Sequence, residues 1–382
     1  MNREKLQKLG FGVFLAAFFI FLIAFNRSLT FREPGDIKAD VEYEKAQAVR
    51  ILSDTLAPDP EFPGVKIGVQ KIEFRLLTGS EAGKTVTANN FVSRTENNPA
   101  KVGTKMLLAS YDGFATCTVE NYIREPVVYA LILAFALLVV LVGRGSGARS
   151  LFSLVFTLAN VVWLFIPLII RGAPPVLASM LVVVLSSAVM LIFITGFSQK
   201  TFVAAVSCIL CTCAAGLIAY LVGAVGHVSS LNTPQAEDLI FVAQQTPLKI
   251  HDLLFAGILI SSLGAVLDTA VSITSAIYEM RELNPGISAK QLLKSGMNVG
   301  KDTMGTMTNT LILAFAGSGI NLFVIYYMYK LPYVQLINLD LLVIEFIQGL
   351  SGSIAVVLSI PLSAALASRI FTRISPKNRR PG

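Results

Sequence analysis

Histidine, cysteine and tryptophan are scarce in this sequence. Its 382 residues include two histidines, four cysteines and one tryptophan. Two histidines without an organised acid cluster do not make a metal centre, and four cysteines, three of them in one apolar segment, do not make a disulfide framework. Cys208 and Cys211 lack the second ligand pair of a zinc site, so we interpret them as small packing residues. We therefore predict no metal site and no cofactor.

Charged residues are also few, at 14% of the chain, against 54% hydrophobic residues. The hydrophobic residues come in blocks long enough to cross a bilayer, which excludes an ordinary soluble domain. The net charge of +7 does not indicate nucleic acid, because the basic residues lie mostly beside the apolar blocks and form no patch with interleaved aromatics. We predict a polytopic α-helical membrane protein whose surroundings are the lipid bilayer, with no nucleic-acid partner.

Eight apolar segments predict eight membrane spans. They cover residues 9–25, 127–142, 151–170, 176–194, 202–225, 253–277, 309–328 and 341–367. The first segment follows basic residues and has no small-x-small cleavage site, so residues 1–26 are predicted to be an uncleaved signal anchor. Lysine and arginine concentrate in alternate connections, which places both termini in the cytoplasm. The predicted regions after the outer domain are residues 126–225 with four spans, an outer loop over 226–252 with a short interfacial helix, residues 253–368 with three spans, and a basic cytoplasmic tail over 369–382.

Residues 27–125 have the composition of a soluble domain instead. Short runs bounded by Gly, Pro and Asn predict five strands, over residues 46–52, 65–77, 84–91, 102–111 and 114–122. In the second run the apolar alternation changes phase between Val69 and Ile72, which predicts a bulge or bend in that strand. We expect a small all-β barrel, OB-like or SH3-like, on the extracytoplasmic side. No motif in this domain identifies a ligand.

The main functional candidates lie between residues 257 and 310. On a helix over residues 253–277, small and polar side chains recur at steps of three or four and so share one face: Gly257, Ser261, Gly264, Asp268, Ser272, Ser275 and Glu279. A lone aspartate near the centre of a span costs roughly 2.5 to 3.5 kcal/mol, so it should face protein or water. We expect its partner on the next helix, where Asp302, Thr306 and Asn309 share a face.

Two further segments carry polar signals. Ser288 and Gln291 have the spacing of a capping box, which predicts an amphipathic cytoplasmic helix over residues 288–300. The last span places Glu345 and Gln348 on one face together with two glycines, in the half nearer the outside.

Several motifs resemble the YibE/F family of bacterial membrane proteins. They are residues 263–268 (Leu-Gly-Ala-Val-Leu-Asp), 282–285 (Glu-Leu-Asn-Pro) and 300–317, together with Gly79-x-x-x-Gly83-Lys84-x-Val86 and Asn89-Asn90 in the outer domain. The resemblance implies a multi-pass protein of the bacterial cytoplasmic membrane, mostly in Gram-positive organisms. Lys301 departs from the arginine frequent at that position in the family, which weakens any bidentate role for it. The resemblance implies no biochemical activity.

Three functions compete at this point. The first is a transporter or channel for an ion or small solute, with a polar site between the sixth and seventh spans centred on Asp268. The second is a scaffold or sensor whose outer domain binds an envelope component or partner protein, with Asp268 a structural hydrogen bonder and the small residues serving close packing. The third is an intramembrane enzyme, which we reject because the neighbouring serines lack a base and no phosphate-binding loop is present. A second copy of the chain is a further partner to consider.

Overall fold

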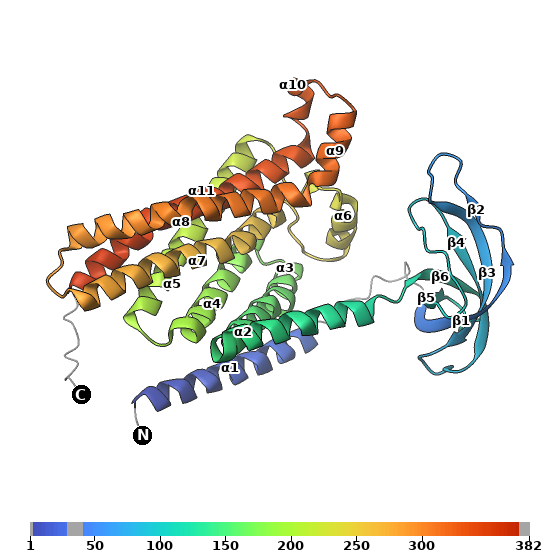
Figure 1. Cartoon of the computed structure of the whole chain (residues 1–382), viewed down its shortest axis with the longest axis horizontal. Coiled ribbons are helices and arrows are strands. Elements are labelled where there is room, and N and C mark those ends of the chain that lie inside the picture. Colours follow the sequence, from blue (N-terminus) through green and yellow to red (C-terminus); the bar gives the residue numbers. More distant parts are fainter. Residues whose placement is uncertain (1–2, 29–40, 374–382) are drawn as a thin grey trace. The chain divides into compact units, whose positions relative to one another are not determined.

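The structure is a computed structural model, and it describes residues 3–28 and 41–373. The chain divides into two compact units (Figure 1). One unit combines Met1–Thr30 with Val140–Gly382 and is helical, and the other, Phe31–Val139, contains the strands. Parts of the predicted regions, among them the basic tail from residue 374 onward, lie outside the described residues.

The β unit is a small barrel. Its strands are β1 (Glu42–Asp54), β2 (Ala57–Pro58), β3 (Lys66–Leu76), β4 (Thr85–Val92), β5 (Lys105–Ser110) and β6 (Cys117–Tyr122). The order β1-β5-β6-β4-β3 closes through a β1–β3 pairing, and the short β2 adds to β3. The five predicted strands are therefore present. The β4–β6 pair is parallel, so the chain crosses over as in the Greek-key barrel of the OB-like alternative.

The irregularity predicted for β3 lies instead in its neighbour β1. Gln70, Ile72 and Phe74 all point into the barrel, so β3 keeps one phase along its buried half. The register between β1 and β3 shifts at Val49 and again at Leu52, each an extra residue on β1. The prediction therefore assigned the irregularity to the wrong strand. The apolar residues near the start of β3 lie on its outer face, but other segments partly cover them. A pattern of alternation cannot reveal such covering, so by itself it indicates a change of phase.

The helical unit contains long apolar helices, as expected of a membrane protein. The described helices are α1 (Arg3–Arg27), α2 (Glu125–Asn160), the π-helical turn η1 (Val161–Phe165), α3 (Ile166–Ile170), α4 (Pro175–Thr195), α5 (Gln199–Val225), the 3₁₀ turn η2 (Ser230–Asn232), α6 (Ala236–Gln245), α7 (Leu253–Leu283), α8 (Ala289–Ser318), α9 (Ile320–Met328), α10 (Tyr333–Leu336) and α11 (Asp340–Arg373). Among them, six stretches are long and apolar enough to cross a membrane, or seven if α8 and α9 together form one bent span.

One of these stretches is too long for a single crossing. Glu125–Ile170 contains 46 residues, about 69 Å if it were one straight helix, whereas a hydrocarbon core is about 30 Å thick. Arg144 interrupts it with φ 48° and ψ −129°, which are not helical angles. Arg144 therefore joins two helices, at the position where the sequence separates the second and third predicted spans.

Helix α8 differs from the prediction of a cytoplasmic helix followed by a separate span. It runs unbroken for 30 residues and includes residues 300–310, a stretch rich in threonine and glycine that we call the polar motif. Threonine hydroxyls there donate to carbonyls of the preceding turn, as Thr306 does to Thr303 at 2.9 Å. The predicted capping box of Ser288 and Gln291 is present. The chain then bends by 61° between α8 and α9, at Gly319, so the predicted span over 309–328 is broken in its middle.

Helix α7 occupies the centre of the helical unit, packed against α4, α5, α8 and α11. These helices run alongside one another in Figure 1. Val266, Ala270 and Ile273 on α7 are completely buried, and α7, α5 and α11 share one apolar cluster. This packing determines which face of α7 remains available for function.

Candidate functional site

The polar face of α7 points away from the bundle. The predicted small and polar residues do lie on one face, but most are exposed rather than packed between helices: Gly257, Ser261, Gly264, Asp268, Ser272 and Glu279. Val266 and Ile273, on the opposite face, form the core contacts. The acid is thus placed on an outer strip of the helical unit and not in its interior.

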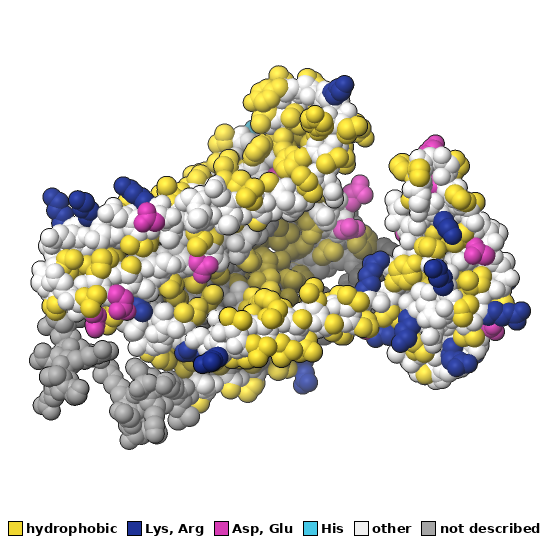
Figure 2. All heavy atoms as spheres, in the orientation of Figure 1, with side chains coloured by type: hydrophobic (Ala, Val, Ile, Leu, Met, Phe, Trp, Pro, Cys, Tyr) yellow, Lys and Arg dark blue, Asp and Glu magenta, His cyan; other side chains and the backbone are white. Residues whose placement is uncertain are grey.

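Helix α8 carries a second outward strip. Asp302, Thr306 and Asn309 are exposed, whereas Met307 and Leu311 pack against the core shared with α7. The two helices contact each other, so the strips lie on adjacent elements. We call them together the polar strip, defined by Ser261, Gly264, Asp268, Ser272, Asp302, Thr306 and Asn309. Figure 2 shows the surface over α7 and α8 as largely white, with few charged side chains.

The register of the two helices separates Asp268 from its expected partner. Two sets of contacts show which residues of the antiparallel helices α7 and α8 lie at the same height. Gly296 of α8 contacts Ile277 of α7, and Gly352 of α11 contacts both Ser262 of α7 and Leu311 of α8. In this register Asp268 lies level with Gly305, whereas Asn309 lies level with Gly264, four residues or about 6 Å away from Asp268 along α7. No hydrogen bond joins Asp268 to Asn309, and Asp268 has no bonding partner within the described chain.

The hydroxyl groups of the polar strip can still accept hydrogen bonds. The Ser261 hydroxyl donates to the Ile258 carbonyl at 3.1 Å, and Thr306 donates similarly within α8. A hydroxyl that donates to its own helix still has lone pairs for an ion or a water molecule. The strip therefore presents carboxylate, amide and hydroxyl oxygens, the groups that coordinate hard cations or bind small polar solutes.

Glu345 and Gln348 form a separate location on α11. Glu345 lies against Gly319, where α8 ends: a Cβ placed on Gly319 would be 3.6 Å from the Glu345 carboxyl carbon. Its Oε2 is buried and has no hydrogen-bond partner in the described chain. The Gly352–Ser262 contact places Glu345 level with Phe255 on α7, about 20 Å from the level of Asp268. The two acids thus cannot form one site.

The β unit contains a clamped loop that sequence reasoning missed. The side chain of Asp59 is fully buried, and its carboxylate accepts two bonds from Arg94, Nε to Oδ2 at 2.6 Å and Nη2 to Oδ1 at 3.1 Å. The backbone amides of Glu61 and Phe62 also donate to Oδ1. The hydrogen bond from Arg94 holds the pKa of Asp59 below its usual range. Asp59 and Arg94 are 35 residues apart, so local spacing carries no signal of the pair.

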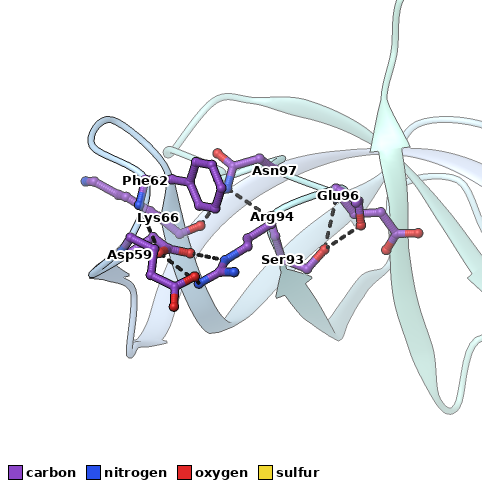
Figure 3. A network of polar contacts seen from close by, with 9 residues as sticks. Asp59, Phe62, Lys66, Ser93, Arg94, Glu96 and Asn97 are labelled. Carbon is purple, nitrogen blue, oxygen red and sulfur yellow. Dashed lines mark hydrogen bonds and ion pairs between the residues drawn. The ribbon is translucent and has the colours of Figure 1, made fainter. Parts of the chain in front are cut away.

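This clamp presents an aromatic ring to the surroundings. Phe62 is 53% exposed, and the Arg94 guanidinium lies 5.0 Å from its ring centroid. The Asn97 side-chain amide donates to the carbonyls of Lys66 and Ser93, and these bonds connect the loop after β4 to the start of β3 (Figure 3). Figure 3 shows these side chains gathered at one end of the barrel. The ion pair and the Asn97 hydrogen bonds thus hold the loop that carries the exposed Phe62 ring.

Over residues 3–28 and 41–373, no group of three His, Cys, Asp or Glu side chains is arranged to hold a metal ion. Residues 131–373 match the family of YibE/F-like proteins. The match begins after β6, the last strand of the β unit, so the resemblance of the glycine and asparagine motif in the strands stays a prediction. No curated protein and no solved structure matches the chain.

Proposed function

We propose that this chain, which belongs to the YibE/F-like family, is a transporter or channel for an ion or small polar solute in the bacterial cytoplasmic membrane. The observation that carries the proposal is the placement of Asp268 on the polar strip, on an apolar helix and without a hydrogen-bond or ion-pair partner among the described residues. We assign substrate contact to Asp268, with Asn309 and Thr306 as neighbouring donors and acceptors.

The cost of a bare acid in lipid supports this assignment. An aspartate at mid-span facing hydrocarbon costs roughly 2.5 to 3.5 kcal/mol, and intramembrane acids accordingly line water-filled pathways or meet partners. A purely structural role within one chain would need a hydrogen bond to a neighbouring helix, and Asp268 makes none to the described residues. A water-lined strip satisfies Asp268, Asn309 and Asp302 together.

The proposal includes a topology of eight crossings with both termini in the cytoplasm. The break at Arg144 divides Glu125–Ile170 into two crossings, and the bent α8–α9 pair forms another. With the remaining long helices this makes eight, which agrees with the distribution of lysine and arginine. The β unit then lies on the extracytoplasmic side.

Flux through vesicles tests the function. Full-length protein in liposomes should conduct at least one member of a panel of common ions and small solutes, and Asp268→Asn should abolish that flux while leaving folding and insertion intact, because the change keeps shape and removes ionisation. Glu279→Gln, on the same face of α7 but near its end, is the matched control and should retain flux. Equal passage through wild type, Asp268→Asn and protein-free vesicles would falsify the transport proposal.

A scaffold or sensor role is the second candidate, and it is favoured by the exposed Phe62 on its clamped loop. In that case a photo-crosslinking residue at position 62 should capture one discrete envelope component in cells. The same residue at the exposed Thr87 of β4 serves as control and should capture none. Equal products at both positions would count against a specific contact through Phe62.

A further inference from the structure

A small cavity lies between the first helix and the π-helical turn η1. It has a volume of about 290 Å³ and is lined by Phe19, Leu22, Ile23, Asn26, Arg27 and Trp163. Leu22 is buried against the bundle and forms its inner wall, whereas Ile23 and Trp163 are 56% and 50% exposed and form its outer edges. The cavity is therefore apolar along most of its length and opens sideways, toward the region that lipid tails occupy around a span.

The cavity is held in shape by polar contacts at one end. The Asn26 side-chain amide donates to the Trp163 carbonyl at 2.8 Å and to the Leu22 carbonyl at 2.8 Å, which joins α1 to η1. Arg171 follows α3 and reaches back to α1, donating to the Phe25 carbonyl and to the Ser28 hydroxyl. A π-helical turn in a long helix commonly accompanies a functional site.

Two positive charges at this end lack acidic partners in the described chain. The partners of Arg171 are a carbonyl, a hydroxyl and the ring of Phe25, 4.0 Å from its guanidinium carbon, and all are neutral. Arg27 makes no ion pair with a described residue, and the ion pairs that are described all lie in the β unit. Arg27 is the last residue of the apolar helix α1, and Arg171 follows directly after α3, so both lie at helix ends, where lipid phosphates are found around a span.

We propose that this cavity binds one anionic phospholipid, with part of an acyl chain between Leu22 and Trp163 and the phosphate at Arg27 and Arg171. An apolar slot beside guanidinium groups that have no acidic partner among the described residues is complementary to a lipid that combines a hydrocarbon chain with a negative headgroup. The volume is at the small end of ligand cavities, about 300 Å³, and accommodates part of a chain rather than a whole lipid. This site is independent of the polar strip on α7 and α8.

Trp163 is the single tryptophan of the chain, so its fluorescence reports on this cavity directly. Full-length protein in mixed micelles is titrated with phosphatidylglycerol carrying brominated acyl chains, which quench tryptophan on contact, and in parallel with phosphatidylcholine carrying the same chains. We expect half-quenching at about fivefold lower mole fraction of phosphatidylglycerol, the factor equivalent to about 1 kcal/mol for one basic residue at an anionic surface.

Variants of Arg27 decide the proposal. Arg27→Gln should remove the preference, Arg27→Lys should retain it, and Arg149→Gln, which changes another arginine with neutral partners, should leave it unchanged. An unaltered tryptophan emission spectrum and elution volume show that each variant is folded. Equal quenching by both lipids in wild type overturns the proposal, as does a preference that survives in Arg27→Gln. Relief of the quenching by free glycerol phosphate would also overturn it, because the ligand would then be a soluble phosphate.

Discussion

Gly300 of α8 lies directly against the side chain of Ile360 of α11. A Cβ added to Gly300 would overlap Cγ2 of Ile360 and come within 3.1 Å of its Cβ. Ile360 is 2% exposed and β-branched, so it has little freedom to move away. Close packing thus requires a glycine at position 300, the first residue of the polar motif. This glycine allows α8 to approach α11 closely.

Gly300→Ala is therefore expected to destabilise the protein. Overpacking a core contact costs about 1 to 3 kcal/mol. Gly305→Ala is the matched control in the same motif, because nothing lies within 4 Å of a Cβ at Gly305 and alanine favours a helix. Thermal unfolding of the purified protein in detergent should show a lower midpoint for Gly300→Ala and an unchanged or higher one for Gly305→Ala. The reverse order would contradict the packing.

The Asp59–Arg94 pair predicts a pH dependence for the β unit. The pKa of Asp59 is lowered in the folded state by the hydrogen bond from Arg94, so its stabilising contribution is present above the unfolded value, about 3.9. That contribution is lost as the pH falls through the lower folded pKa. Denaturation midpoints of wild type and Asp59→Asn should differ at neutral pH and converge at low pH. Glu81→Gln, which removes an exposed ion pair with Lys84, should match wild type throughout.

The β unit should fold by itself. Ile72, Phe74, Met106 and Leu108 are completely buried within it, so the barrel has its own core. Expressed as residues 41–124, it should be soluble and largely β by circular dichroism, with a cooperative unfolding transition. A mainly helical or unfolded spectrum would refute this expectation.

Reporter fusions test the proposed topology. Fusions after Arg144, Lys200 and Lys294 should report the cytoplasm, and fusions near Gly79, Gly172 and Pro234 should report the outside, because lysine and arginine favour the cytoplasmic connections. Lys294 is the sharpest position, since it lies between α7 and the polar motif of α8. An outside signal at Lys294 would contradict the topology of eight crossings.

Much of the architecture could be predicted from the sequence. The apolar blocks and the strand-like runs predicted the long helices and the five strands of the barrel, because hydrophobic periodicity is a local property. The capping box at Ser288 also depends on residues three positions apart. Residues of the α7 face were assigned correctly to one side of the helix for the same reason, since helical geometry fixes which side chains share a face.

What only the tertiary structure decided was how these elements meet. Periodicity places Asp268 on a face but does not say which neighbour that face contacts, so its outward position and its separation from Asn309 follow from the packing of α7 against four other helices. The Asp59–Arg94 clamp and the α1–η1 cavity join residues far apart in sequence, and no local spacing encodes such contacts. The sequence determined which side chains each helix and strand presents, and the packing of those elements determined where each side chain points, because burial is a property of the assembled chain.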